Sequence, residues 1–343
     1  MTDPAGAEPA QRPDGAGQRG DSPLPDIQLG RRVVLRYRLP AGYPQPLTDV
    51  IGELVSLDPP TVRGADGQVV AVAPDRVVAM KALGPRPIRT REIRALETAA
   101  AYGWPGIEQA WIDGWLLRAG HGYTNRANSA VPLGSSDGPA ALGADTLQRI
   151  GEWYTAHGLP VQLALPDRLA PLPLGWRSRR ETRLLAIDIE NFVLPQGPPM
   201  VRIAPAPDDA WLSMHRHGGE DPATQAFSTP PVVEVLTAVH DGEVGFASLG
   251  LPRPIAIGRG ALTTAPDGRH WIGLTCVAVA AEHRRHGLGS LVCAELIRWG
   301  ADRGATHAYL QVEAENTVAI AMYHELGFLD HHSYRYATPD GPR

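Results

Sequence analysis

The hydrophobic pattern changes character along the chain, from short strand-like runs in the first part to a mixture of strands and helices later. Residues 1–27 hold almost no large apolar side chains and are rich in Gly, Pro, Asp and Gln, so we expect a disordered tail. From residue 30 to about 80, short apolar runs alternate with turn signals such as Asp66-Gly67. The prolines of Gly84-Pro85-Arg86-Pro87 indicate a linker, after which helical periods appear.

The block of short strands spans residues 28–83. Strands are expected at 32–37, 50–57, 68–73 and 76–80. Several short strands in so small a stretch predict a small SH3-like β-barrel. Such a module either binds a partner or packs against the rest of the chain. No aromatic cage is evident in it, so packing or regulation is the favoured interpretation.

The remaining sequence predicts a mixed α/β sheet, because antiparallel strands precede a strand–helix–strand–helix–strand order. Helices are expected at 89–102, 144–157, 207–216 and 317–328, with another beginning at Leu288. Strands or hairpins are expected at 109–118, 126–133, 161–165, 184–189, 200–203, 232–239, 243–249, 254–262, 271–279 and 309–314.

A glycine loop stands between the expected strand at 271–279 and the helix that begins at Leu288. It reads Arg284-Arg285-His286-Gly287-Leu288-Gly289-Ser290. Glycines let the backbone approach a ligand closely, and the free N–H groups and dipole of a first helical turn favour an anion. No Gly-Lys pair follows, and Val292 stands where a dinucleotide fingerprint needs a small residue. The loop is therefore interpreted as a pyrophosphate site.

This Arg-x-x-Gly-x-Gly pattern resembles the acetyl-CoA loop of the GNAT superfamily of N-acetyltransferases. A second stretch, Asn316 to Phe328, resembles the other half of that superfamily's signature. Its matching positions are Asn316, Ala319, Tyr323, Leu326, Gly327 and Phe328. Two motifs in the right order and spacing extend the resemblance over residues 200 to 338.

The resemblance implies a set of site residues for acetyl-CoA. The backbone of Val277, Ala278 and Val279 would hold the pantetheine arm. The loop residues Arg284, Arg285, His286, Gly287, Leu288, Gly289 and Ser290 would hold the pyrophosphate. Either Arg284 or Arg285 would meet the 3′-phosphate or stay solvated. Asn316 would cap its helix, contact the CoA arm, or do both.

The resemblance also implies direct attack of an amine on the thioester. A backbone N–H near Val277 would stabilise the oxyanion, and Tyr323 would protonate the departing thiolate. The base is less well defined. Some relatives carry a glutamate where this chain has Gly273, and Glu313 on the next strand is the leading candidate. His240 and Glu220 are weaker candidates for that role.

An internal sequence repeat predicts two copies of the fold. Leu174-Gly175-Trp176 resembles Leu326-Gly327-Phe328, and Val161 to Leu165 resembles the strand at 309–314. The loop counterpart, Ser135 to Gly143, has no arginine. We therefore expect a tandem arrangement after the barrel. A degenerate GNAT-like copy at 88–195 serves as core partner and wall of the substrate cleft, and an acetyl-CoA-binding GNAT domain follows at 199–338.

The acceptor stays open. Barrel, degenerate copy and active copy together resemble actinobacterial tandem-GNAT proteins often labelled N-acetylglutamate synthases, which would imply L-glutamate and arginine biosynthesis. Arginines at 118, 126, 253 and 259 would then be candidates for binding its carboxylates. Another small-molecule amine or a protein lysine remains an alternative acceptor. A non-catalytic acyl-CoA sensor is the alternative to an enzyme.

Composition and charge limit the partners and the cellular location that we expect for this protein. A net charge of −5 argues against a nucleic-acid partner. No apolar run reaches membrane-spanning length and no signal peptide is evident, so we expect a cytoplasmic protein without a membrane partner. No metal-ligand spacing occurs, His331-His332 is interpreted as a surface pair, and Cys276 and Cys293 as buried small hydrophobes. The sequence does not indicate the oligomeric state.

Overall fold

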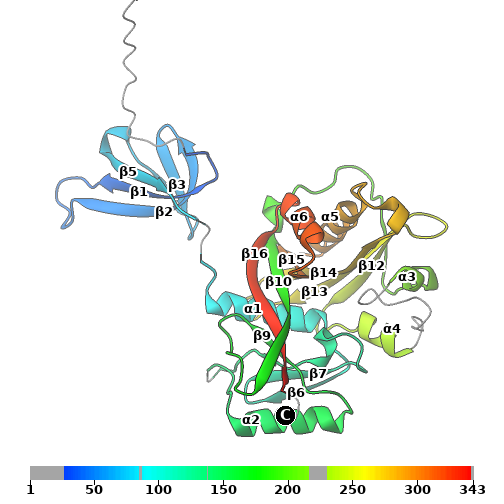
Figure 1. Ribbon diagram of the computed structural model, residues 1–343. Coiled ribbons are helices and arrows are strands. Elements are labelled where there is room, and N and C mark those ends of the chain that lie inside the picture. The colour runs from blue at the N-terminus through cyan, green and yellow to red at the C-terminus, as the bar shows by residue number, and fades with distance from the viewer. Residues whose placement is uncertain (1–26, 85–86, 137, 216–229, 341–343) are drawn as a thin grey trace, which may run out of the picture. The chain divides into compact units, whose positions relative to one another are not determined.

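The computed structural model describes residues 27–340 except 85–86, 137 and 216–229 (Figure 1). It divides the chain into two compact units, the first ending at Pro87 and the second beginning at Ile88. The disorder expected for residues 1–27 concerns positions outside the described residues, apart from Ile27. That side chain is buried in the core of the first unit.

The first unit is one antiparallel sheet. Its strands are β1 (Arg32–Arg38), β2 (Leu47–Leu57), β3 (Pro60–Gly64), β4 (Val69–Ala71) and β5 (Val77–Ala82), with a 3-10 turn η1 at Pro74–Arg76. They lie in the order β4-β3-β2-β1-β5, around the completely buried side chains of Val33, Leu35, Leu54 and Val62. This confirms the small SH3-like sheet. In the described residues β4 and β5 are its two edges, so the sheet stays open rather than closing into a barrel.

The second unit alternates strands and helices. Its first half contains α1 (Thr90–Gly103), β6 (Glu108–Ile112), β7 (Trp115–Ala119), η2 (Arg126–Asn128), β8 (Val131–Pro132), α2 (Ala144–Ala156), β9 (Leu163–Pro166), β10 (Trp176–Asp188) and η3 (Ile189–Asn191). Its second half contains β11 (Arg202–Ala204), α3 (Asp209–Met214), α4 (Pro230–Thr237), β12 (Glu243–Leu249), β13 (Ala256–Thr264), β14 (His270–Val279), η4 (Ala281–His283), α5 (Leu288–Ala301), β15 (His307–Glu313), α6 (Thr317–Glu325) and β16 (Leu329–Pro339).

The two halves share their sheet by exchanging their last strands. The main sheet has the order β11-β12-β13-β14-β15-β10-β16-β9. A parallel bridge between Ala130 and Leu163 links β9 to the small sheet β6-β7-β8. The β10–β16 pair therefore lies at the centre. The strands β15, β14 and β13 follow in order beyond β10, and β9, β8 and β7 follow in order beyond β16. The order confirms a mixed α/β sheet with tandem copies, in which each copy's last strand pairs with the other copy.

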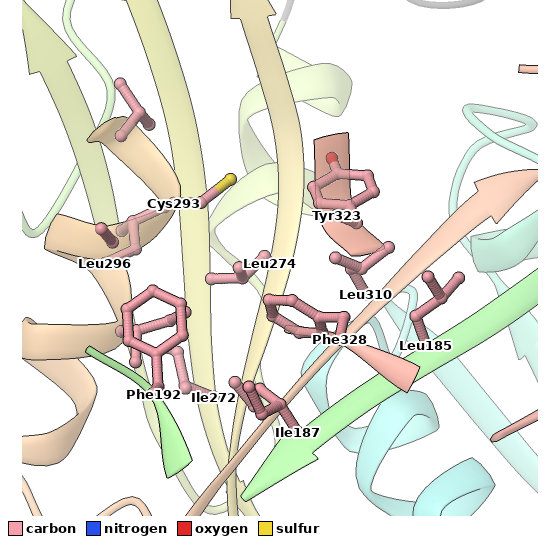
Figure 2. Close-up of a cluster of buried hydrophobic side chains, with 14 of the residues drawn as sticks. Leu185, Ile187, Phe192, Ile272, Leu274, Cys293, Leu296, Leu310, Tyr323 and Phe328 are labelled. Carbon is pink, nitrogen blue, oxygen red and sulfur yellow. The ribbon is translucent and has the colours of Figure 1, made fainter. Parts of the chain in front are cut away.

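The two faces of the main sheet bury different clusters. Helix α5 and the residues of α6 cover one face, where Ile272 and Leu274 of β14 pack with Leu296 of α5 (Figure 2). On the other face, Trp271 of β14 packs among side chains of α1. Because successive strand residues point to opposite faces, β14 and β15 contribute to both clusters. This alternation fixes which side chains can reach a ligand from each side.

One expected strand was wrong and another was wrong in part. Of the strand expected at 232–239, residues 232–237 belong to α4. Of the strand expected at 126–133, residues 126–128 form the 3-10 turn η2 and only Val131–Pro132 form a strand, β8. The run Val232-Val233-Glu234-Val235 favours a strand by propensity. Helical spacing instead places Val232, Val235 and Leu236 on one face, where they pack in a cluster with Trp211, so packing overrides the propensity.

His331 and His332 on β16 are not the surface pair that we expected. His332 is buried, and its Nε2 lies 2.8 Å from Oε1 of Glu97 on α1. Its Nδ1 lies 2.7 Å from Nδ1 of His331. Burial and the neighbouring His332 lower the pKa of His331 to about 3.

This depressed pKa predicts a loss of stability in acid. The unfolded chain protonates His331 near pH ~6.5, whereas the folded protein resists protonation down to about pH 3. The free energy of unfolding should therefore fall as the pH decreases through this window, by up to about 1.4 kcal/mol for each pH unit. Urea titrations at several pH values should show a shallower decrease for His331→Gln. Parallel profiles for the two proteins would contradict this origin.

Candidate active site

Strands β14 and β15 separate part of the way along their length. They pair in parallel only from Trp271 to Leu274, whereas β14 continues to Val279 alongside β13. We call the gap beyond Leu274 the wedge. β14 also carries one extra residue here, because Ala278 pairs with Ile257 while Thr275 pairs with Arg259. The main chain of residues 275–279 therefore has an edge free of β15.

The glycine loop begins helix α5 as expected. Gly287 is the N-cap with φ +73°, a conformation that glycine adopts without strain. The amide of Leu291 donates to the Gly287 carbonyl at 2.9 Å, so the preceding amides of Leu288, Gly289 and Ser290 have no acceptor within the helix. A Cβ at Gly289 would lie 3.3 Å from Sδ of Met322. The loop thus presents main-chain donors, and its residues 284–287 are exposed.

The remaining loop side chains take different positions. Arg284 donates from Nε to the carbonyl of Val279 at 3.3 Å, which ties the loop to the end of β14. Arg285 is exposed and has φ +65°. Nδ1 of His286 lies 3.3 Å from the carbonyl oxygen of His283. Arg284 thus has a contact with the main chain of β14, whereas Arg285 is exposed.

Two residues of the second motif, Asn316 and Tyr323, lie at the start of α6 and within it. Asn316 caps the helix, because its Oδ1 accepts the amide of Ala319 at 3.1 Å. Tyr323 is 8% exposed, and its ring meets that of Phe328 edge-on at 6.1 Å (Figure 2). Burial, with a smaller effect of Cys293, raises the pKa of Tyr323 above its ordinary value. The hydroxyl therefore keeps its proton at neutral pH, as a proton donor must.

A cavity of about 350 Å³ opens beside the wedge, on the face of the sheet that carries α1. We call it the wedge cavity. The first copy contributes Trp104, Tyr123, Thr124, Asn125, Arg126, Arg180 and Thr182, and the second His215, Thr275, Cys276, Gln311, Glu313, Tyr334 and Tyr336. The cavity is thus built between the copies. Residues of the first copy form one of its walls.

The candidate bases differ in their surroundings. The side chain of Glu313 is 58% exposed at the cavity rim, with Oε1 3.2 Å from Nη1 of Arg180. Of the weaker candidates, His240 does not line the cavity, and Glu220 lies outside the described residues. A glutamate at position 273 would collide with Tyr309, whose hydroxyl occupies the space beside Gly273. The position at which some relatives carry a glutamate is therefore closed by packing.

Sequence reasoning missed His215, which is only 6% exposed and lines the same cavity. Its ring stacks on Trp211 at 5.1 Å, and its Nε2 lies 2.6 Å from the Tyr123 hydroxyl. The chain has twelve histidines, and His215 belongs to no recognisable motif. The only signal for it in the sequence was its place near the end of the helix expected at 207–216.

The four arginines considered for binding an acceptor carboxylate have different surroundings. Arg126 lines the wedge cavity, with its guanidinium 5.4 Å from the Trp104 ring centre. Arg118 and Arg259 are buried and donate to main-chain carbonyl oxygens. Arg253 is exposed in the turn before β13. Only Arg126 of these four is positioned to meet a ligand in this cavity.

Within the described residues, no cluster of three or more His, Cys, Asp or Glu side chains is arranged to hold a metal ion. The same part of the chain contains no helix that is both long and apolar enough to cross a membrane.

A splayed parallel strand pair, a glycine turn at the next helix and a two-copy sheet define a GNAT-type acyltransferase, a superfamily that uses acetyl-CoA. The chain belongs to the family described as "Probable histone acetyltransferase Rv0428c C-terminal", which matches residues 90–337. A companion family, "Rv0428c N-terminal Sm-like domain", matches residues 27–81. These matches confirm the resemblance to GNAT acetyltransferases.

The chain is also similar to individual proteins. The chain is 41% identical over 313 residues to "Probable histone acetyltransferase Rv0428c" of Mycobacterium tuberculosis, covering 90% of this chain and 94% of the relative. It is 28% identical over 265 residues to "Uncharacterized N-acetyltransferase YobR" of Bacillus subtilis, covering 71% and 98%. Among solved structures, a GCN5-related N-acetyltransferase from Kribbella flavida aligns with a TM-score of 0.49 and 19% identity, covering 75% and 98%.

Proposed function

We propose that this protein transfers the acetyl group of acetyl-CoA to a primary amine by direct attack. The observation that carries this proposal is the wedge, a gap in the sheet at residues that line the cavity, with β14 leading on from it to the donor-rich loop of α5. A cosubstrate bound at the loop can reach an acceptor in the cavity only through such a gap.

The cosubstrate would be held mainly by main chain. The amides of Gly287, Leu288, Gly289 and Ser290 suit the diphosphate, since they lie at the positive end of the α5 dipole. The free edge of Val277 to Val279 would hydrogen-bond the pantetheine arm. His286 and Asn316 flank this path, and Arg285 is the loop cation that would meet a further phosphate.

The chemistry needs an oxyanion donor, an acid and a base. The amide near Val277, at the bulge of β14, would stabilise the charge that develops on the thioester oxygen. Tyr323 would protonate the departing thiolate. Glu313, at the cavity rim, would accept the proton that the acceptor ammonium must lose. His215 is the second candidate base, because its imidazole lines the same cavity.

Two acceptors have separate support. The 41% identical relative is named a probable histone acetyltransferase, which supports a protein lysine of the histone class. Arg126 supports a small amine with a carboxylate, such as L-glutamate, because it brings a guanidinium into the cavity. Its Nε is buried without a hydrogen-bond partner in the described part of the protein.

An acceptor screen tests the proposal. Purified protein with acetyl-CoA, free glutamate, other small amines and histone-like peptides should release CoA thiol with at least one amine. Gly287→Ala should weaken acetyl-CoA binding roughly tenfold, because a Cβ is disfavoured at its φ of +73°. Gly143→Ala, at the N-cap of the corresponding helix α2 with φ −74°, is the matched control. Binding without turnover on any amine would instead support a sensor.

A further inference from the structure

Cys276 is a thiol in the wedge cavity that the proposed reaction does not use. The sequence presents it as a buried small hydrophobe, but it is only partly buried and lines the cavity. It is the bulged residue of β14, with φ +55°. Left-handed backbone is unfavourable for a cysteine, and such strain and bulges concentrate where a side chain is redirected for function.

The thiol lies among groups that can take its proton or stabilise its charge. The imidazole of His215 lines the same cavity as the thiol, and each of the two groups shifts the pKa of the other in favour of its charged form. That imidazole is held from its other side by the Tyr123 hydroxyl, 2.6 Å from Nε2, and by stacking on Trp211. His215 comes from the second copy and Tyr123 from the first. The copies together therefore position a histidine against a cysteine, an arrangement that generates nucleophilic thiolates.

A buried cation lies beneath the same thiol. Arg259 is completely buried, and its Nη1 lies 3.5 Å from Oγ1 of Thr275, the residue before Cys276. Its other donors meet main-chain carbonyls, and in the described residues it forms no ion pair. A thiolate at Cys276 would supply the nearby negative charge that a buried guanidinium otherwise lacks.

The second cysteine provides the contrast. Burial alone acts on Cys293 of α5, and it raises the pKa of that thiol to about 12. Burial also acts on Cys276, but His215 and Arg259 outweigh it and bring the pKa of that thiol below its usual value. The two thiols therefore lie in opposite electrostatic surroundings.

We propose that Cys276 is a nucleophile that takes the acetyl group from acetyl-CoA by thioester exchange. This inference rests on the proposed function, which places the thioester carbonyl at the amide next to Cys276. His215 takes the thiol proton, and the Cys276 sulfur bonds to the carbonyl carbon. The bond from that carbon to the CoA sulfur breaks, and the electron pair leaves with the CoA sulfur, to which His215 returns the proton. One thioester replaces another, so the exchange is reversible, and it needs no amine in the cavity.

The test uses the full chain and acetyl-labelled acetyl-CoA without any amine. Intact mass and peptide mapping should show one added acetyl group on Cys276, which excess CoA or hydroxylamine removes. Cys276→Ser should remain unlabelled while it binds acetyl-CoA with unchanged affinity by calorimetry. Cys293→Ala, the matched control, should be labelled like the original chain. His215→Gln should slow labelling by roughly 10²-fold, because the base is lost.

The outcomes separate this inference from the proposed function. Acetyl-CoA that binds but leaves Cys276 unlabelled, or acetyl found only on lysines, overturns the nucleophile and leaves amine acetylation standing. Absence of acetyl-CoA binding overturns both. Iodoacetamide provides a readout that needs no acetyl-CoA, since Cys276 should be alkylated at least tenfold faster than Cys293 at neutral pH. Equal rates for the two thiols would count against an activated Cys276.

Discussion

Replacing Tyr323 by phenylalanine should lower the turnover of amine acetylation by roughly 10²-fold. The change removes one hydroxyl from a side chain that is 8% exposed and keeps the ring that packs against Phe328. Without that hydroxyl, the CoA sulfur must leave as an unprotonated thiolate or wait for water. Acetyl-CoA affinity should stay within about twofold, since ground-state contacts are otherwise intact. Steady-state thiol release and calorimetry measure the two quantities.

The control for this substitution is another buried tyrosine. Tyr154 of α2 is completely buried, and its hydroxyl bonds to the main chain of Arg118, away from the wedge cavity. Tyr154→Phe should lower stability and leave turnover per folded molecule unchanged. Turnover of Tyr323→Phe equal to that of the unmodified chain would remove Tyr323 from the mechanism. Its motif match would then reflect packing of α6 alone.

The glycine loop and α6 could be predicted from the sequence because each depends on neighbouring residues. A left-handed glycine at position 287 starts α5, and Asn316 caps α6 through an amide three residues later. Such local geometry leaves a fixed spacing in the chain. The barrel-like first unit was likewise readable from its turns, except for β3, a five-residue strand that starts at Pro60 and ends at Gly64.

The wedge cavity could not be predicted in this way. Trp104, Tyr123, His215 and Tyr336 come from separate segments, and they meet because β10 and β16 exchange places between the copies. Nothing in the spacing of these residues reveals an exchange, since either pairing buries the same apolar faces. The role of Cys276 was hidden for a similar reason. Its neighbours His215 and Arg259 lie on other elements, and its bulge appears only in the pairing of β13 with β14.

Arg259 shows how burial can reverse an interpretation. The sequence offered it as a ligand for an acceptor carboxylate, yet it is completely buried. It donates to the carbonyls of Leu236, Gly103 and Ala238 at 2.7, 3.0 and 2.9 Å. Its guanidinium also lies 4.5 Å from the Trp104 ring centre. It therefore joins α1, α4 and β13 around the wedge cavity.

Replacing Arg259 by methionine should lower the free energy of unfolding by about 3–5 kcal/mol. Burial lowers the pKa of Arg259 to about 10, so the group is still charged at neutral pH and forms charge-assisted hydrogen bonds. Methionine fills similar space but leaves three buried carbonyls without a donor. Chemical denaturation measures the loss. The free energy of unfolding of Arg259→Lys should lie between those of the methionine variant and the unmodified chain, because an ammonium keeps the charge but cannot reproduce the planar fork of donors.

Arg253→Met is the matched control, because that arginine is exposed six residues earlier, and its effect should stay within about 0.5 kcal/mol. An equally small effect at position 259 would mean that the carbonyls find other partners and that Arg259 does not anchor the copies.

The structural role of Arg259 and its effect on Cys276 are linked. If Arg259 also favours the thiolate of Cys276, the methionine variant should alkylate that thiol more slowly under conditions where it is still folded, while Cys293 reacts at its original rate.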